Sequence, residues 1–203
     1  MDAGSIAVPH RTPSAVAQQA PPVSNTRLAM LVVIAAESML FAGLIGMYLV
    51  FRLSARDWPP PDLPRLPLGM TAANTLVLFA SLVPMTRALR AVRRAEHAAL
   101  VRAIQATALL GTLFLAVQGV EWMRLVRHGL TLASSMYGAT FYTLIGCHGL
   151  HVLAAVTWLA VVAVLARRGA LRPARHAALE MCAMYWYFVC ALWGLLFPLV
   201  YLY

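Results

Sequence analysis

The chain has 203 residues, of which 62% are hydrophobic and only 11% are charged. Its mean hydropathy of +0.75 is typical of a protein that crosses a membrane several times and excludes an ordinary soluble domain. The formal net charge is +9, but all sixteen basic residues are arginines, and most lie in short stretches between apolar runs. This charge indicates membrane topology, with no nucleic-acid partner.

The N-terminal part of the chain is predicted to be a disordered cytoplasmic tail, residues 1–27. It is rich in Ala, Pro and Ser and shows no helical period. It also lacks the apolar core of a signal peptide. The first apolar run, residues 28–51, is long enough to span a bilayer and contains one ionisable residue, Glu37. It ends at residues 52–67, where five prolines exclude a helix.

Four further apolar runs follow. They cover residues 68–86, 103–123, 136–166 and 177–202. A basic amphipathic stretch connects the second run to the third. The fourth run is longer than a bilayer requires, so we expect it to tilt or to extend beyond the bilayer. The sequence therefore predicts an all-α fold, with residues 28–203 forming a single domain of five transmembrane helices.

The arginines predict how these helices are oriented. Eleven lie in the tail and in the second and fourth connections, whereas five lie in the first and third connections. Cytoplasmic segments carry the excess of basic residues. We therefore expect the N-terminus in the cytoplasm and the C-terminus in the periplasm.

Two histidines, His148 and His151, lie in the middle of the fourth run, and their spacing places them on one helix face. Ionisable groups in membrane segments rarely point at lipid, so both rings need partners in other runs. At about 1.5 Å per residue, Glu37 lies at a similar depth and can reach them. The alternatives are hydrogen bonds across helices, or metal or haem ligation, which would need further histidines on another helix.

The carboxylates and cysteines leave several interpretations open. Glu37 is either a proton-relay group, a ligand for a lipid head group or a hydrogen-bonded packing group. Glu121 lies near the predicted outer end of its run, one turn after Gln118, and is expected to reach water. The three cysteines are expected to be buried small apolar residues, because they show neither disulfide nor metal-site spacing; they are Cys147, Cys182 and Cys190. No catalytic motif occurs.

Short motifs occur in all five apolar runs. They are Glu37, Ser38 and Phe41; Asn74 and Thr75; Gln118, Glu121 and Trp122; Phe141, Gly146, His148, Gly149, His151 and Val152; and Tyr185, Trp186, Phe188, Val189 and Trp193. These motifs, in this order, are those of subunit III of the haem-copper oxidases (the cytochrome c oxidase subunit III family). From about residue 29 onward, the chain resembles the shorter five-helix bacterial form of this family. Two positions depart from the family pattern: Tyr187 and Cys190 replace the usual His and Asp.

The resemblance implies a non-catalytic subunit in the bacterial inner membrane, with no haem, copper or other metal of its own. Members pack against oxidase subunit I, whose complex carries the haem and copper. They hold phospholipid in a cleft between two helix groups and support proton uptake during oxygen reduction. The first two runs would form one group and the last three the other.

The resemblance also implies roles for individual residues. Five residues would be lipid-cleft or proton-linked: Glu37, His148, His151, Glu121 and Gln118. Glu37 would line the cleft, and internal polar contacts would come from His148, His151 and Glu121. The packing motif would comprise Asn74, Thr75, Tyr185, Trp186 and Trp193. Two alternatives are an accessory subunit of a nitric oxide reductase system and a small transporter. The second would need inverted repeats or paired broken helices, which are not evident in the sequence.

Overall fold

The computed structural model of the chain describes residues 25–61, 66–169 and 176–202. Its elements are α1 (Asn25–Ser54), α2 (Leu68–Ala80), α3 (Leu82–Arg93), α4 (His97–Arg127), α5 (Met136–Arg167), α6 (His176–Phe197) and a short π-helix, η2 (Pro198–Leu202). Most of the predicted tail, up to residue 24, lies outside the described residues, and residues 25–27 already belong to α1.

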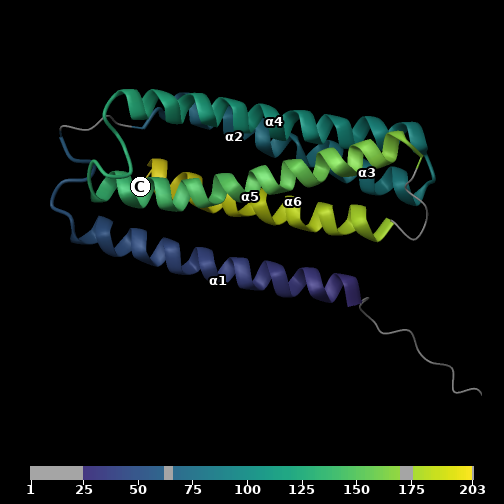
Figure 1. Cartoon of the computed structure of the whole chain (residues 1–203), viewed down its shortest axis with the longest axis horizontal. Coiled ribbons are helices and arrows are strands. Elements are labelled where there is room, and N and C mark those ends of the chain that lie inside the picture. Colours follow the sequence, from purple (N-terminus) through teal and green to yellow (C-terminus); the bar gives the residue numbers. More distant parts are fainter. Residues whose placement is uncertain (1–24, 62–65, 170–175, 203) are drawn as a thin grey trace, which may run out of the picture.

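Five helical segments in the described ranges are long and apolar enough to cross a membrane. They are Asn25–Ser54, Leu68–Arg93, His97–Arg127, Met136–Arg167 and Ala177–Leu202. The predicted all-α fold with five membrane spans is therefore confirmed. The start of α1 and the end of η2 lie at opposite ends of the bundle, as an odd number of spans requires (Figure 1).

The helices are arranged around α5 and α6. Helix α1 lies on one side of this pair, and α2 and α4 lie on the other (Figure 1). Helix α4 packs along α2, α3 and α5, whereas α1 packs against α5 and α6. The prediction that the first two spans form one group is wrong, because α1 packs mainly on α5 and α6, whereas α2 packs mainly on α4.

The second span is broken into α2 and α3 at Ser81. Pro84 has no backbone N–H, so the carbonyl of Ala80 cannot receive the usual helical hydrogen bond. Ser81 is fully buried at this break and accepts a hydrogen bond from the indole nitrogen of Trp186, with the two atoms 3.1 Å apart. The span then continues to Arg93, past the predicted end of its apolar run.

Gly111 of α4 lies where α4 meets α5 and α6. A Cβ atom at this position would lie 2.5 Å from a ring carbon of Trp186 and 3.0 Å from a methyl carbon of Val156. Trp186 is fully buried, so its ring has no free space into which to move. Overpacking of a core typically costs about 1–3 kcal/mol.

We therefore expect Gly111→Ala to lower the free energy of unfolding by about 2 kcal/mol. Thermal unfolding of the full chain in detergent measures this. Gly119→Ala on the same helix is the matched control, because nothing lies within 4 Å of the added Cβ. A similar loss in both variants would show that close packing at Gly111 is not the cause.

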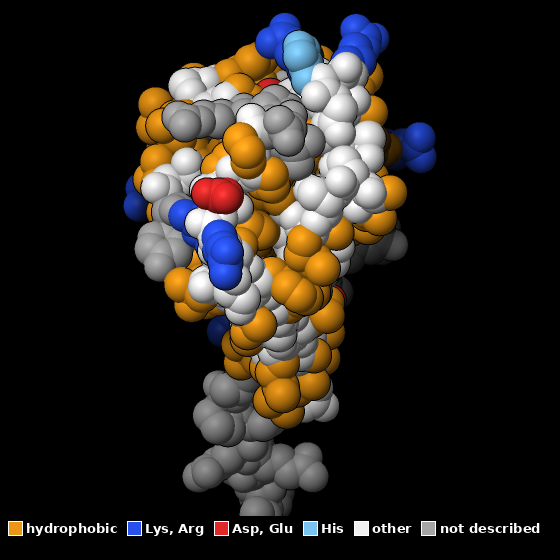
Figure 2. Space-filling model, turned by 90° about the vertical axis from the view of Figure 1, so that its left-hand side faces the viewer, with side chains coloured by type: hydrophobic (Ala, Val, Ile, Leu, Met, Phe, Trp, Pro, Cys, Tyr) orange, Lys and Arg blue, Asp and Glu red, His pale blue; other side chains and the backbone are white. Residues whose placement is uncertain are grey.

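Helix α1 is the least buried of the five spans and presents apolar side chains outward. Exposed large residues include Val32, Met39, Val50 and Leu53. Figure 2 shows hydrophobic side chains over α1, which projects at the bottom of that view. Besides its apolar contacts, α1 is held at its start by Arg27, whose guanidinium lies 2.7 Å from a carboxylate oxygen of Glu180 on α6. Such a surface suits contact with lipid or with another membrane protein.

Candidate functional site

The shortest contact between charge-capable groups in the membrane-spanning part joins α1 to α5. His151 Nε2 lies 2.6 Å from Glu37 Oε2. The side chains of His151 and Glu37 are only 14% and 27% exposed, respectively. The similar depths of Glu37 and the two histidines in their apolar runs thus predicted the right partner for one of these histidines.

The other ring nitrogen of His151 fixes how protons are placed in this contact. Nδ1 lies 2.7 Å from the backbone oxygen of Cys147, which can only accept a hydrogen bond. Nδ1 therefore carries hydrogen and donates it to that carbonyl. The short distance between Nε2 and the Glu37 carboxyl then holds one further proton, bound either to the imidazole or to the carboxyl.

His148 has a different environment from His151. Its ring is stacked on Trp193 at 5.2 Å between centroids and 22° between planes. It is 1% exposed, and neither ring nitrogen has a hydrogen-bond partner among the residues that the structure describes. The prediction that His148 makes an internal polar contact is therefore wrong within the described part of the chain. Its imidazole packs against aromatic rings instead. Phe41 covers both imidazoles edge-on, which explains its place in the first motif.

An apolar groove of about 630 Å³ lies between α4 and α5 beside His148. Gln118 and Trp122 line it from α4, and His148 and Leu150 line it from α5. The Gln118 side-chain oxygen and the Trp122 indole nitrogen are buried without a partner in the described part of the chain. Of the predicted lipid-cleft or proton-linked residues, Gln118 and His148 line this groove, whereas Glu37, His151 and Glu121 do not.

Glu121 belongs to a second buried polar cluster, between α4 and α2. Both of its carboxylate oxygens lie 3.1 Å from the hydroxyl of Thr71. Gln118 donates to one of these oxygens at 3.0 Å, and its side-chain nitrogen also lies 3.4 Å from the Tyr201 hydroxyl. Glu121 is only 1% exposed, so the expectation that it reaches water is wrong: Thr71 and Gln118 provide its partners inside the bundle.

The Asn74 and Thr75 motif fixes α2 against the other helices. Asn74 donates to the backbone oxygen of Phe114 on α4 at 3.0 Å. Thr75 donates to the backbone oxygen of Thr71 and accepts a hydrogen bond from the Trp193 indole nitrogen at 2.9 Å. These polar residues therefore support packing between α2, α4 and α6.

The two departures from the family pattern lie on α6. The Tyr187 hydroxyl lies 2.9 Å from that of Thr86 on α3, so this position still makes a polar contact between helices. Cys190 is buried, as is Cys182, whereas Cys147 is half-buried rather than buried as expected. Tyr185 is buried beside Trp158, with ring centroids 6.2 Å apart.

Two members of the Glu121 cluster, Thr71 and Tyr201, were not predicted from the sequence. Thr71 lies one helical turn before Asn74 and Thr75, and this spacing could have predicted a polar face on α2.

Within the described ranges, no three His, Cys, Asp or Glu side chains come together to form a possible metal site. The Nε2 atom of His151 faces Glu37 rather than a second histidine.

Comparison with known proteins gives a consistent result. The family model for cytochrome c oxidase subunit III matches residues 16–203. Cytochrome c oxidase subunit 3 of Synechocystis sp. is 36% identical over 170 residues, covering 82% of this chain and 71% of the relative. Probable cytochrome c oxidase subunits 3 of Nocardia farcinica and Mycobacterium leprae are 34% and 36% identical, each covering 83% of both chains. The chain therefore belongs to the cytochrome c oxidase subunit III family.

Proposed function

We propose that this chain is the non-catalytic subunit III of a terminal haem-copper oxidase in the bacterial inner membrane. It packs against catalytic subunit I, whose complex carries the haem and copper, and supports proton uptake and stability during oxygen reduction. The observation that carries this proposal is the contact between Glu37 and His151. It joins α1 to α5 through two ionisable groups inside apolar spans, where such groups are costly and usually functional.

The orientation is part of the proposal. The end of the bundle where α3 meets α4 carries most of the described arginines, which favours placing this end and the N-terminus in the cytoplasm. Glu37 lies twelve residues into α1, about 18 Å from its start. This depth is near the middle of a hydrocarbon core about 30 Å thick.

The apolar groove between α4 and α5 supports a role in holding lipid. The Trp122 ring packs against Gly149, which has no side chain. A Cβ atom added at Gly149 would lie only 2.8 Å from a carbon of that ring. The unpaired indole N–H of Trp122 lies within two turns of the end of α4, a depth that suits the ester carbonyl of a phospholipid. A lipid chain would then run past His148 along exposed Leu150 and Leu153.

Glu37→Gln tests the proton-linked role separately from packing. The glutamine amide can still donate to His151 Nε2, so we expect thermal stability of the chain to change by less than about 1 kcal/mol. The variant cannot exchange a proton, so we expect the oxidase complex to lose activity several-fold faster during continuous turnover. Time courses of oxygen consumption measure this loss. Unchanged time courses would remove Glu37 from the proposed role.

The assembly itself is tested by mild-detergent purification of the tagged chain from its native membrane. Optical spectra and identification of the bound chains give the readout. Haem together with oxidase subunit I supports the proposal. A nitric oxide reductase in their place would change the reaction, and stoichiometric haem on the isolated chain would show that the non-catalytic assignment is wrong.

A further inference from the structure

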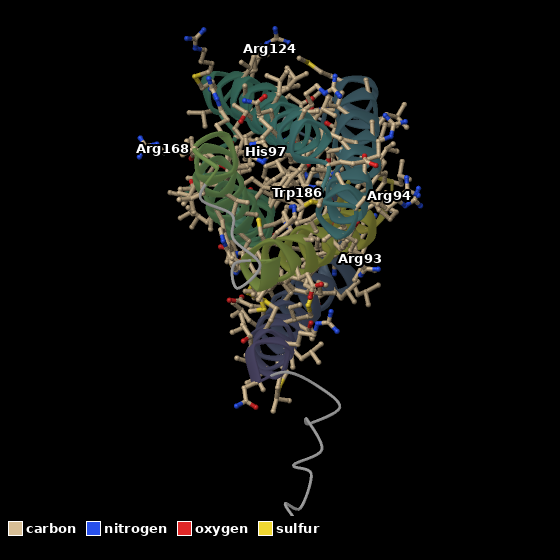
Figure 3. The ribbon with its side chains drawn as sticks, turned by 90° about the vertical axis from the view of Figure 1, so that its right-hand side faces the viewer. Arg93, Arg94, His97, Arg124, Arg168 and Trp186 are labelled. Atoms are coloured by element: carbon tan, nitrogen blue, oxygen red, sulfur yellow. The ribbon has the colours of Figure 1, made fainter. Side chains whose placement is uncertain are left out.

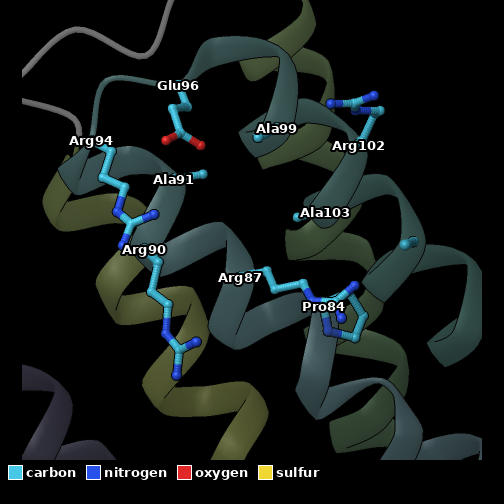
Figure 4. A pocket seen from close by; sticks show the side chains of 10 residues that line it. Pro84, Arg87, Arg90, Ala91, Arg94, Glu96, Ala99, Arg102 and Ala103 are labelled. Carbon is cyan, nitrogen blue, oxygen red and sulfur yellow. The ribbon is translucent and has the colours of Figure 1, made fainter.

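A hollow of about 530 Å³ lies between α3 and α4, at the end of the bundle where the chain turns from one helix to the other. Arg87 and Arg90 of α3, with Arg94 just beyond its end, form one wall, and Arg102 of α4 lies on the other (Figure 4). Glu96, in the turn between the helices, is the one carboxylate in the lining, and alanines and one proline make up the rest. The lining therefore carries a net charge of three positive.

These arginines have no protein counter-ion in the described residues. Arg87, Arg90, Arg94 and Arg102 make no side-chain hydrogen bond or ion pair there, and all four are exposed. By contrast, Arg27 at the same end of the bundle is paired with Glu180. Figure 3 looks at this end and shows Arg94 and Arg93 at its edge, away from buried Trp186. An excess of arginine on one side of a membrane sets topology, but it does not by itself create a hollow lined from two helices.

The row of arginines along the hollow is long enough to cross the head-group layer of a bilayer. Arg87 and Arg94 are seven residues apart on or beside α3, which corresponds to about 10 Å along the helix axis. The head-group layer on each side of a bilayer is about 5–8 Å thick. Arg94 lies just after the end of α3, so a row of arginines that begins at the membrane surface would reach the border of the hydrocarbon core.

Both walls continue into apolar surface toward the middle of the membrane. On α3, Val83 lies one turn before Arg87 and is 52% exposed. On α4, Ala106 lines the hollow. Leu109 lies one turn after it and is 69% exposed. A ligand that fits both parts has an anionic head and apolar tails.

We propose that this hollow binds the phosphate-bearing head group of an anionic phospholipid, with the acyl chains lying along the exposed faces of α3 and α4. The planar guanidinium groups of Arg87 and Arg102 suit phosphate oxygens, which they can contact with two hydrogen bonds each. The alanines leave space between the two walls. This site is separate from the groove beside His148, and the inference does not depend on the oxidase assignment.

The test uses the full chain in a neutral detergent, titrated with phosphatidylglycerol, phosphatidylcholine or inorganic phosphate and followed by native mass spectrometry. Arg87→Gln/Arg102→Gln is the test variant. Arg124→Gln/Arg127→Gln, at the opposite end of the bundle, is the control with the same loss of charge. Glu96→Gln removes the carboxylate from the lining. Thermal unfolding of each variant confirms that it is folded.

We expect phosphatidylglycerol to bind the native chain more tightly than phosphatidylcholine does. Each arginine near an anionic membrane component contributes roughly a fivefold factor, so the test variant should bind phosphatidylglycerol about 25-fold more weakly. The control pair should keep the native affinity, and Glu96→Gln should bind more tightly. Equal losses in the test and control variants would overturn the proposal. Inorganic phosphate that binds at the hollow and displaces phosphatidylglycerol would overturn it in favour of a soluble anion.

Discussion

Replacing His151 by leucine is expected to lower the free energy of unfolding of the chain by about 3 kcal/mol, since removal of one member of a buried pair leaves the other unpaired. The Glu37 carboxyl would lose its contact at 2.6 Å and face apolar side chains. The backbone oxygen of Cys147 would lose its additional hydrogen bond from Nδ1. Thermal or denaturant unfolding in detergent, with the native chain as reference, measures the change.

The double variant Glu37→Leu/His151→Leu distinguishes loss of a polar pair from loss of packing. Two apolar side chains leave no unpaired carboxyl, so most of the stability should return, to within about 1 kcal/mol of the native chain. Oxygen-consumption time courses should nevertheless stay impaired, because neither leucine can hold a proton. If the double variant were less stable than His151→Leu alone, the two residues would contribute independently rather than as a pair.

Trp193→Ala should have the larger effect on stability, about 4 kcal/mol. The indole is fully buried, and its ring lies 5.2 Å from each of the His148 and Phe114 rings, measured between centroids. Truncation would open a cavity between α4, α5 and α6 and remove the hydrogen bond to Thr75. The free energy of unfolding in detergent, at matched protein concentration, is the measurement.

Trp193→Phe is the matched control, because it keeps an aromatic ring and removes the indole N–H. We expect a loss of about 1 kcal/mol, the usual net contribution of one hydrogen bond. The difference between the alanine and phenylalanine variants then reports the contribution of aromatic packing around His148. Equal losses in both variants would assign the whole effect to the bond with Thr75.

Sequence predicted the number of spans because each apolar run is long enough to cross a bilayer. It predicted their ends less well, since arginine favours helix and its long side chain can reach the interface from inside a span. Helix α3 therefore continues through Arg90 to Arg93, although the apolar run ends at Thr86. Pro84, close to the end of that apolar run, follows the break between α2 and α3 at Ser81.

Which helices pack together could not be predicted from apolar faces alone, because such faces resemble one another and the lipid around them. Residue depth was sufficient to join Glu37 to His151. Residue depth was not sufficient to predict the burial of Glu121. That burial depends on Thr71 of another helix, and the sequence did not show that α2 packs on α4. The same gap explains His148: its environment depends on the Trp193 ring, which only the packing of α6 on α5 brings into place.

The loosely packed α1 has a consequence for how the chain assembles. Sliding this helix by one turn, about 5.4 Å, along α5 and α6 would exchange one set of apolar contacts for a similar one. It would, however, separate Glu37 from His151 and Arg27 from Glu180. These two contacts are ten residues apart on α1, about 15 Å along its axis. Together with the buried rings of Phe41 and Tyr48, they fix the register and rotation of a helix whose remaining apolar side chains are largely exposed.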